Sequence, residues 1–354
     1  MTETEQLLED AGLIYLTDSS PGISRKKLNG KFVYLDKKGE KITDDKLLVR
    51  ISKLVLPPAW ENVWIAPKAN AHLQATGIDQ AGRKQYRYHH DWSRHRNETK
   101  YFRLLEFGSK LPDFRKNILK DLRRKDLDER KVLAISVNLM QKTLIRVGNE
   151  EYKNLYGSYG LTTLRDRHVK ISGNTLKLSF KGKKGVEHEI DLHDKKLVNL
   201  VKKCRDIPGQ ELFQYYTADG ERRSIDSGKI NRYIREVSCC DFTAKDFRTW
   251  SGTLEMLRQL SFVEYPENET LKKKIIVSAL DEVASKLGNT RTICKKSYVF
   301  PPLLDSYLNA DLRPYLKKVK KLASLPSDKG LNSDEKVLLN FLKSERKKRV
   351  LQKK

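Results

Sequence analysis

The chain has 354 residues, of which 38% are hydrophobic, so it can bury cores in about two or three domains and is not globally disordered. Its 71 Lys and Arg outnumber its 46 Asp and Glu, and the formal net charge of +25 favours a polyanionic partner: DNA, RNA or an anionic membrane. The chain has no run of 18 apolar residues and an acidic, polar start, which argues against a membrane span and a signal peptide and predicts a cytoplasmic protein.

Residues 1–95 are predicted to form a small β-rich domain. Short strands are indicated at 31–35 and 63–67, because each run is apolar or aromatic and is bounded by turn residues or proline. The segment 77–88 predicts a turn that leads into another strand, with aromatic residues two apart.

Polar and aromatic side chains alternate on the last of these strands. Gln85 can read adenine through two hydrogen bonds, and Tyr86 and Tyr88 can contact bases or phosphates. The alternative is an exposed sheet face that binds nothing.

A mainly helical domain is predicted from residue 96 to residue 315. Its clearest helix carries an apolar stripe at spacings of four and three residues, formed by Leu133, Val137, Met140, Leu144 and Val147. We predict that Gly148 ends this helix, which places Arg146 in its last turn. Arg146 is either a solvated arginine favoured by the helix dipole, or a phosphate ligand beside the glycine-flanked stretch 157–163.

One β segment interrupts the helices. Apolar residues alternate with period two over 169–190, and the alternation is broken at Gly173 and at Gly182–Gly185, which predicts a three-stranded antiparallel sheet. Lys183 then lies at the tip of a hairpin. It is either an ordinary turn lysine or a cation placed in a DNA groove, where partial desolvation would lower its pKa and let it donate a proton.

Two further cations, Lys245 and Arg248, lie three residues apart, a spacing that places them on one face of a helix. Like charges on one face are unfavourable unless an anion binds them, so the pair is either a solvated basic face or a phosphate site. Arg248 offers a planar fork for two phosphate oxygens.

Asn289 precedes Tyr298 by nine residues (298 − 289). Tyrosine is a poor nucleophile, with a pKa of about 10 in water. It attacks a phosphodiester only where fixed cations stabilise the charge that develops at phosphorus. Tyr298 is therefore either packed in the core or such a nucleophile, and the neighbouring Lys295 and Lys296 favour a polar, cationic setting.

The segment 316–354 is a basic tail with 13 Lys and Arg against 4 Asp and Glu, and Ser333-Asp334-Glu335 before an apolar run predicts a capped helix. The 4 cysteines lack CxxC spacing, so we expect reduced thiols and no metal site. The sequence contains no GxxxxGK[ST] loop, which leaves nucleotide hydrolysis without support.

In their order along the chain, several segments resemble the type IB DNA topoisomerases, in particular the poxvirus and bacterial group. These segments are Leu56–Trp60, Gly82–Tyr88, Ile145–Asn149, Gly157–Thr163, Phe180–Lys183, Lys245–Thr249 and Lys296–Tyr298. The resemblance covers roughly residues 15–305. It implies an α+β fold in which the β-rich domain 1–95 precedes the helical catalytic domain 96–315, with a catalytic fold shared with the tyrosine recombinases.

The resemblance also implies roles for the candidate residues. Tyr298 would attack one DNA strand, form a 3′-phosphotyrosyl bond and release a 5′-hydroxyl. Arg146, Arg248 and Asn289 would contact the non-bridging phosphate oxygens, and Lys183 would protonate the departing 5′ oxygen. Many members carry histidine where this chain has Asn289, whose amide can donate a hydrogen bond but cannot exchange a proton near neutral pH. The residues implied in DNA binding are Tyr152 and Lys245 around the scissile phosphate, and Gln85, Tyr86 and Tyr88 in the N-terminal domain.

The implied reaction exchanges one phosphodiester for another. We therefore expect relaxation of supercoiled DNA by strand rotation and religation, with no ATP or other required cofactor and with divalent cations at most stimulatory. The implied partner is double-stranded DNA clamped by a monomer, which in a bacterium would be associated with the nucleoid.

Two other functions account for parts of the sequence. A tyrosine site-specific recombinase has a similar site, but recombinases usually show His-x-x-Arg where this chain has Lys245-x-x-Arg248, and their N-terminal arm is helical. A non-catalytic nucleic-acid-binding protein explains the net charge of +25 but not the ordered motifs.

Overall fold

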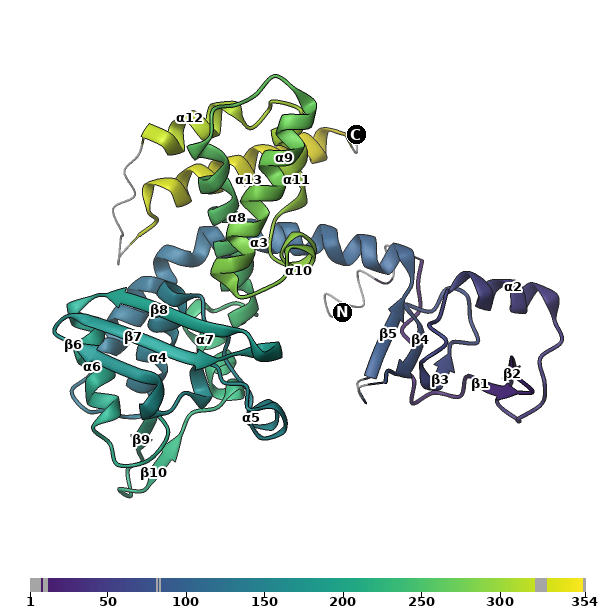
Figure 1. The fold of residues 1–354 in the computed structure, drawn as a ribbon, viewed down its shortest axis with the longest axis horizontal. Helices are drawn as coiled ribbons and strands as arrows, with labels where there is room; N and C mark the ends of the chain where they lie inside the picture. Colours follow the sequence, from purple (N-terminus) through teal and green to yellow (C-terminus); the bar gives the residue numbers. More distant parts are fainter. Residues whose placement is uncertain (1–7, 9–11, 81, 83, 322–329, 353–354) are drawn as a thin grey trace. The chain divides into compact units, whose positions relative to one another are not determined.

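The computed structural model describes residues 8, 12–80, 82, 84–321 and 330–352 (Figure 1). The acidic start of the chain and parts of the predicted turn 77–88 and of the basic tail lie outside the described residues. The chain divides into two compact units, Met1–Phe102 and Arg103–Lys354, and the division falls within the long helix α3 (His90–Leu122). The predicted α+β class is confirmed.

The first unit is built on a five-stranded antiparallel sheet in the order β2-β1-β3-β4-β5. The strands are β1 (Ile23–Leu28), β2 (Lys31–Leu35), β3 (Glu61–Ile65), β4 (Leu73–Ile78) and β5 (Lys84–Tyr88). The strands expected at 31–35, 63–67 and near 88 are thus confirmed, the second of them ending at Ile65. Buried side chains of β1, β3 and β4, among them Ile23, Ile65 and Ala75, form the core of this unit.

A short helix in this unit, α2 (Asp45–Lys53), was not predicted. The Asp44 carboxylate caps it by accepting a hydrogen bond of 2.9 Å from the Lys46 backbone N–H. Ile51 is its buried contact with the sheet core. A helix this short does not repeat its apolar pattern often enough to be distinguished from a loop in the sequence.

The second unit is mainly helical. After α3 come α4 (Glu129–Thr143), α5 (Glu150–Tyr156), α6 (Lys195–Arg205), α7 (Ser227–Ser238), α8 (Ala244–Phe262), α9 (Glu269–Leu287), α10 (Arg291–Ser297), α11 (Pro301–Leu308), α12 (Arg313–Lys321) and α13 (Ser333–Gln352). Helix α8 is buried along most of its length and packs against α9, α12 and α13. Because α8 is packed on several sides, the side chains that it carries are held in fixed positions.

The predicted three-stranded antiparallel sheet is confirmed as β6 (Val169–Ser172), β7 (Thr175–Lys181) and β8 (Glu187–His193). It packs on α4 and α6 through the alternate residues of β7, Leu176, Leu178 and Phe180, which are buried. A second hairpin, β9 (Gln214–Tyr216) with β10 (Arg222–Ser224), contradicts the expectation of a single β segment. Strands of three residues are too short to show an alternating pattern.

The end of α4 differs from the prediction. The helix stops at Thr143, because Leu144 adopts a left-handed conformation with φ 58° and its N–H bonds to the Met140 carbonyl. The chain beyond it pairs with residues that follow α5: the N–H of Leu161 donates to the Arg146 carbonyl at 2.8 Å, and that of Thr162 to the Val147 carbonyl at 2.7 Å. Arg146 therefore lies in an irregular segment between α4 and α5 and not in a helical turn, and Gly148 does not end the helix.

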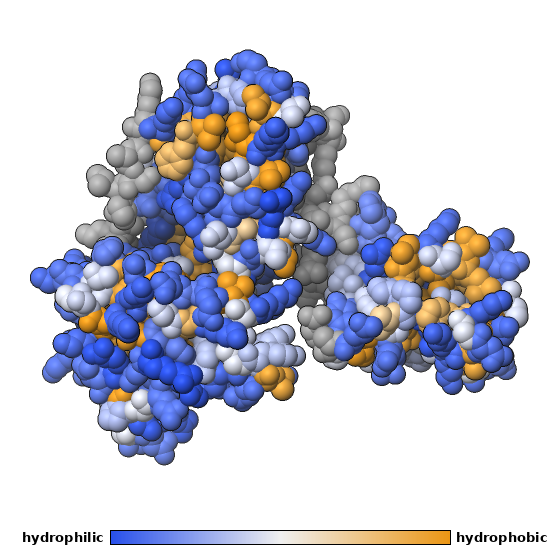
Figure 2. All heavy atoms as spheres, viewed as in Figure 1, coloured by the Kyte–Doolittle hydropathy of each residue, from blue (hydrophilic) through white to orange (hydrophobic). Residues whose placement is uncertain are grey.

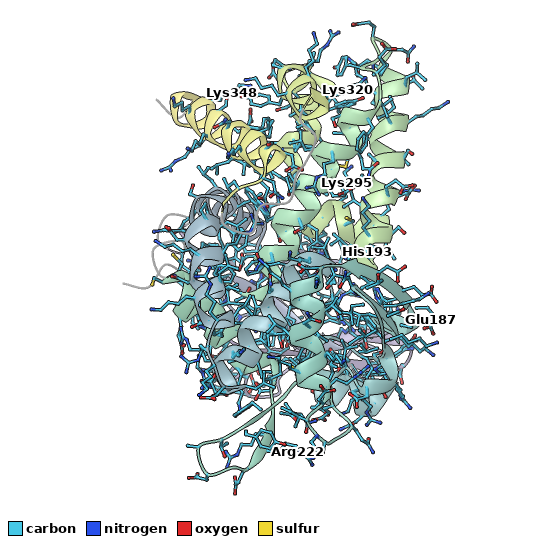
Figure 3. The ribbon with its side chains drawn as sticks, turned by 90° about the vertical axis from the view of Figure 1, so that its left-hand side faces the viewer. Glu187, His193, Arg222, Lys295, Lys320 and Lys348 are labelled. Atoms are coloured by element: carbon cyan, nitrogen blue, oxygen red, sulfur yellow. The ribbon has the colours of Figure 1, made fainter. Side chains whose placement is uncertain are left out.

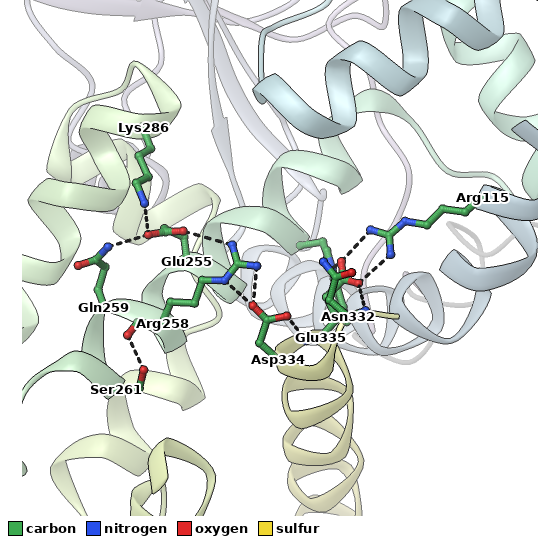
Figure 4. A network of polar contacts seen from close by, with 10 residues as sticks. Arg115, Glu255, Arg258, Gln259, Ser261, Lys286, Asn332, Asp334 and Glu335 are labelled. Carbon is green, nitrogen blue, oxygen red and sulfur yellow. Dashed lines mark hydrogen bonds and ion pairs between the residues drawn. The ribbon is translucent and has the colours of Figure 1, made fainter. Parts of the chain in front are cut away.

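Two buried acids fix the start of the predicted C-terminal helix, α13 (Figure 4). Asp334 is 0% exposed and pairs with Arg258 of α8 at 2.5 Å. Glu335 is 3% exposed, pairs with Arg115 of α3 at 2.7 Å and accepts a hydrogen bond of 3.3 Å from the Trp250 indole. The segment set apart as a basic tail thus contributes a helix that is anchored to α8 inside the second compact unit.

The neighbouring carboxylate, Glu255, makes the stability of this region depend on pH. Burial raises the pKa of Glu255, but hydrogen bonds from Lys286 and Gln259 and the charges of Lys286 and Arg258 outweigh burial, so the pKa lies below its usual value. Such a group contributes stability that is complete above its unfolded-state pKa and is lost as pH falls through the folded-state pKa. We expect Glu255→Gln to lower the free energy of unfolding by about 2 kcal/mol near neutral pH and to flatten its acid dependence.

Urea unfolding of the two proteins from about pH 7 down to about pH 3 checks this prediction. Glu264→Gln, at an exposed position, is the matched control and should leave the curve unchanged. An acid dependence that is the same in Glu255→Gln and the parent would contradict the assignment.

The face of the molecule shown in Figure 2 is mostly hydrophilic. Figure 3 shows basic side chains at widely separated places on the second unit: Arg222 in β10, Lys295 on α10, Lys320 on α12 and Lys348 on α13. None of the described helices is both long and apolar enough to cross a membrane.

Candidate active site

Arg146 and Asn289 are held together at the C-terminal end of α9. Gly288 ends this helix with φ 57°, and its carbonyl accepts a hydrogen bond of 2.8 Å from Nη2 of Arg146. The same nitrogen donates to Oδ1 of Asn289. The Asn289 oxygen is therefore occupied, which leaves its Nδ2 as the group that can meet a ligand.

Two glycines let the chain that carries Arg146 approach its partner segment closely. A Cβ on Gly160 would lie 2.7 Å from the Arg146 carbonyl oxygen and from the Gly148 Cα, a distance that side chains do not tolerate. Thr163 Oγ1 accepts a hydrogen bond of 2.9 Å from the Gly160 N–H. The glycine-flanked stretch 157–163 thus positions the backbone of Arg146.

We expect Gly160→Ala to displace this segment. The Gly160 backbone is extended, with φ −154°, so the substitution tests the lack of space and not backbone conformation. The predicted cost is about 1–3 kcal/mol of stability, and DNA cleavage should slow at least about tenfold because Arg146 moves. Thermal unfolding and a single-turnover cleavage assay measure both effects.

Gly173→Ala, in the turn between β6 and β7, is the matched control. Its φ of +55° strains the backbone, but the space around it is open. It should cost about 1 kcal/mol of stability and leave cleavage unchanged. Equal cleavage by Gly160→Ala and Gly173→Ala would show that the close approach of Gly160 to the segment 146–148 does not position Arg146.

Arg248 lies in α8 and is 5% exposed, so it does not belong to a solvated basic face. One guanidinium nitrogen donates to the Leu144 carbonyl and the other to the Leu287 carbonyl at 2.7 Å. Lys245, three residues earlier, is exposed. The two predicted cations therefore differ: Arg248 is buried and donates to carbonyls at the C-terminal ends of α4 and α9, whereas Lys245 lies at the surface.

The electrostatics of this cluster favour an anion. Burial lowers the pKa of Arg146, and the positive charge of Arg248 lowers it further, whereas Tyr298 acts in the opposite direction. Nε of Arg248 and Nδ2 of Asn289 are buried donors that meet no hydrogen-bond acceptor among the described residues. Two neighbouring arginines, with unused donors on Arg248 and on Asn289, form a site that an oxyanion would complete.

Tyr298 lies beside this cluster, directly after α10, and is half-buried. The Arg248 guanidinium lies 5.0 Å from the centroid of its ring. Gly252 of α8 allows this packing, because a Cβ there would lie 2.8 Å from the Tyr298 carbonyl oxygen. Thr253 Oγ1 donates to the same carbonyl at 3.2 Å and accepts from the Phe300 N–H at 3.2 Å. Helix α8 thus positions both Arg248 and Tyr298.

Lys183 lies in the predicted hairpin tip, within the short turn Lys183–Gly185 between β7 and β8, and is exposed. Its ammonium lies over the Tyr152 ring of α5, 5.6 Å from the centroid. The structure therefore brings Arg146, Arg248, Asn289 and Tyr298 together and places Lys183 against Tyr152, at the edge of the group.

The residues predicted to bind DNA in the first unit all lie on β5, an edge strand. Side chains alternate along a strand, so Tyr86 and Tyr88 share one face, with stacked rings 6.1 Å apart, and Gln85 lies on the other. Gln85 donates a hydrogen bond of 2.8 Å to Asp79, Tyr86 is exposed, and Tyr88 packs partly on Leu8, Leu13 and Trp92.

Three residues of the site were missed by the sequence analysis: Gly252, Thr253 and His188. Gly252 follows Arg248 on α8 by four residues, so helical spacing was the available signal for it, whereas Thr253, five residues on, does not share that spacing. His188 lies opposite Phe180 in the register of β7 and β8, and no spacing relates it to the arginines.

Comparisons with known proteins match segments of both units. The family model of the eukaryotic DNA topoisomerase I catalytic core matches residues 84–321, and that of the bacterial DNA topoisomerase IB N-terminal domain matches residues 31–79. DNA topoisomerase 1B of Acanthamoeba polyphaga mimivirus is 34% identical over 297 residues, covering 81% of this chain and 88% of the relative. DNA topoisomerase 1B of vaccinia virus (strain Copenhagen) is 24% identical over 251 residues, covering 70% and 75%.

These matches support the topoisomerase interpretation and give no support to the recombinase alternative. The two family models cover the strands β2 to β5 of the first unit and the part of the second unit that contains Arg146, Arg248 and Tyr298. The chain belongs to the type IB DNA topoisomerases, which are isomerases that act on DNA.

Proposed function

We propose that this topoisomerase relaxes supercoiled DNA through a covalent bond between Tyr298 and a 3′ phosphate. Attack forms the bond between the tyrosine oxygen and phosphorus and breaks the bond between phosphorus and the 5′ oxygen. The phenol loses its proton to the solvent, and the 5′ oxygen gains one from the Lys183 ammonium. The free end rotates, and the 5′-hydroxyl then reverses the reaction and releases Tyr298.

The observation that carries this proposal is the pair of buried, unused donors beside Tyr298, Nε of Arg248 and Nδ2 of Asn289. A phosphate between them would also meet Arg146, whose guanidinium contacts Asn289. The three side chains would stabilise charge on the non-bridging oxygens, and donors fixed before the reaction contribute most to catalysis of this kind. Asn289 would act as a neutral donor and not as an acid.

The reaction conserves the number of phosphodiester bonds, so it needs no ATP. We propose that the fixed cations stabilise the transition state, that no cofactor is required and that a divalent cation is at most stimulatory. Torsional strain in the DNA supplies the free energy for rotation.

We propose that the protein clamps around duplex DNA as a monomer. Tyr152 and Lys245, both exposed, would contact DNA around the scissile phosphate, and Gln85, Tyr86 and Tyr88 of β5 would contact it from the first unit. The net charge of +25 supports strong, salt-dependent binding to the phosphate backbone. The match to the bacterial N-terminal domain supports an enzyme of the bacterial cytoplasm that is associated with the nucleoid.

A plasmid relaxation assay tests the proposal. Purified protein should relax supercoiled plasmid without ATP and in excess chelator. DNA binding should weaken steeply with salt, by a log–log slope of about −0.9 for each phosphate that the protein neutralises. Failure to relax plasmid at any salt concentration, or a strict need for ATP, would overturn it.

A further inference from the structure

His188 lies near the start of β8, shortly after the turn that carries Lys183, and its side chain lies within the candidate active site. Its ring stacks on Phe180 of β7, with centroids 4.9 Å apart and planes 14° from parallel. Phe180 is 5% exposed, so the ring is supported from the core of the sheet.

Two glycines leave room for the His188 ring, one on each catalytic segment. A Cβ on Gly182, the residue before Lys183, would lie 2.6 Å from Cδ2 and from Nε2 of His188. A Cβ on Gly288, the residue before Asn289, would overlap Cε1 and lie 2.8 Å from Nε2. The imidazole therefore fills the space between the base of the Lys183 hairpin and the end of α9.

The charge of the surroundings suits a neutral ring. Burial lowers the pKa of His188, and the charges of Arg146 and Arg248 lower it further, while Glu187 acts weakly in the opposite direction. A neutral imidazole can pack between the two segments without adding a third positive charge beside the arginines.

The segment at the end of α9, which carries Gly288 and Asn289, is held by hydrogen bonds that do not involve His188. The Gly288 carbonyl accepts from Arg146, the Leu287 carbonyl accepts from Arg248, and the Asn289 N–H donates to the Ala284 carbonyl at 2.9 Å. The hairpin tip is exposed and is held through backbone atoms: the Gly182 N–H donates to the Val186 carbonyl at 2.7 Å and the Gly185 N–H to the Gly182 carbonyl at 3.1 Å. Below the tip, the Tyr159 N–H donates to the Lys181 carbonyl at 2.8 Å, so within the described part of the chain the turn residues themselves have no backbone hydrogen bond from another segment. Loss of the ring should therefore release the hairpin and leave Asn289 in place.

We propose that His188 is a positioning residue that sets the Lys183 hairpin against Gly288 and Asn289. It acts through Lys183, and so the inference rests on the proposed role of Lys183 as the proton donor to the 5′ oxygen. The residue does not touch the DNA in this account. It determines where the ammonium lies when the phosphate is bound.

A substrate with sulfur in place of the bridging 5′ oxygen separates this role from a structural one. A thiol has a pKa of about 8.5, so a thiolate leaves without protonation and makes the proton donor dispensable. His188→Ala should cleave the ordinary substrate about 10–100-fold more slowly in single turnover and the sulfur substrate within about threefold of the parent. The affinity for DNA should change by less than about threefold.

Gly182→Ala is a second variant, because its methyl group enters the space of the ring from the hairpin side, and it should show the same pattern. His193→Ala, at the exposed end of β8, is the matched control and should cleave both substrates as the parent does. Thermal unfolding of each protein establishes that it is folded. If His188→Ala does not fold, Gly182→Ala decides the question.

Lys183→Ala distinguishes failure of this inference from failure of the proposed function. If Lys183→Ala is slow on the oxygen substrate and rescued by sulfur, the general acid is established. His188 is then a positioning residue only if its variant is rescued as well. Normal cleavage by His188→Ala, an equal defect on both substrates or a defect confined to DNA affinity would overturn the inference. A Lys183→Ala defect that sulfur does not relieve would instead overturn the general-acid assignment.

Discussion

Tyr298→Phe is expected to abolish the covalent DNA adduct and plasmid relaxation while DNA binding persists. Removal of the hydroxyl removes the atom that attacks phosphorus, and the loss should be on the order of 10⁴-fold or more, as for other catalytic nucleophiles. The ring and its contact with the Arg248 guanidinium at 5.0 Å remain, so the site keeps its shape. A denaturing gel of protein mixed with labelled DNA reports the adduct, and a binding titration reports affinity.

Tyr307→Phe is the matched control for this variant. Tyr307 is buried, and its hydroxyl has no hydrogen-bond partner within the described part of the chain, so removal of that oxygen should leave folding and cleavage unchanged. An adduct formed by Tyr298→Phe at the parent rate would show that another residue is the nucleophile.

Arg248→Ala is expected to have the second-largest effect, a decrease in the cleavage rate of about 10²–10³-fold. The guanidinium holds the carbonyls of Leu144 and Leu287 and still has Nε available for the phosphate. Lysine cannot make all three contacts, so Arg248→Lys should remain at least about tenfold slower than the parent. Arg222→Lys, in the exposed β9–β10 hairpin, is the matched control and should behave as the parent.

The role of the Arg248 charge can be tested on the substrate. A methylphosphonate at the cleavage site replaces one non-bridging oxygen and removes the negative charge that the arginine would stabilise. The difference between the parent and Arg248→Ala should then shrink to less than about tenfold. If the full difference persists on the neutral substrate, Arg248 acts through the fold and not through the phosphate.

The elements that the sequence predicted best are those with a regular period. Alternation over 169–190 predicted the sheet β6–β8 and the hairpin position of Lys183, because one face of β7 is buried against helices. Three strands of the first unit, β2, β3 and β5, were likewise marked by aromatic residues and turn residues or proline, whereas β1 and β4 were not predicted. In contrast, β9 and β10 are three residues long and were missed.

The sequence predicted which residues belong to the candidate site, but not their backbone conformation, burial or hydrogen-bond partners. The apolar residues continue beyond the end of α4 because the chain after Thr143 is still packed, with Ile145 only 3% exposed. The pattern therefore did not reveal that Arg146 lies outside the helix. Lys245 and Arg248 have the spacing of one helix face, but contacts with the carbonyls of Leu144 and Leu287 bury only the arginine. Such partners come from distant segments, which local periodicity does not report.

Mass spectrometry of the trapped covalent complex can identify the residue that is joined to DNA. A DNA strand that loses its short 5′-hydroxyl fragment after cleavage cannot be rejoined, so the adduct accumulates and can be digested to a peptide with a nucleotide remnant. We expect a remnant joined through its 3′ phosphate to the oxygen of Tyr298, and a released fragment with a 5′-hydroxyl end. A remnant on another residue, or attachment through a 5′ phosphate, would contradict the proposed reaction.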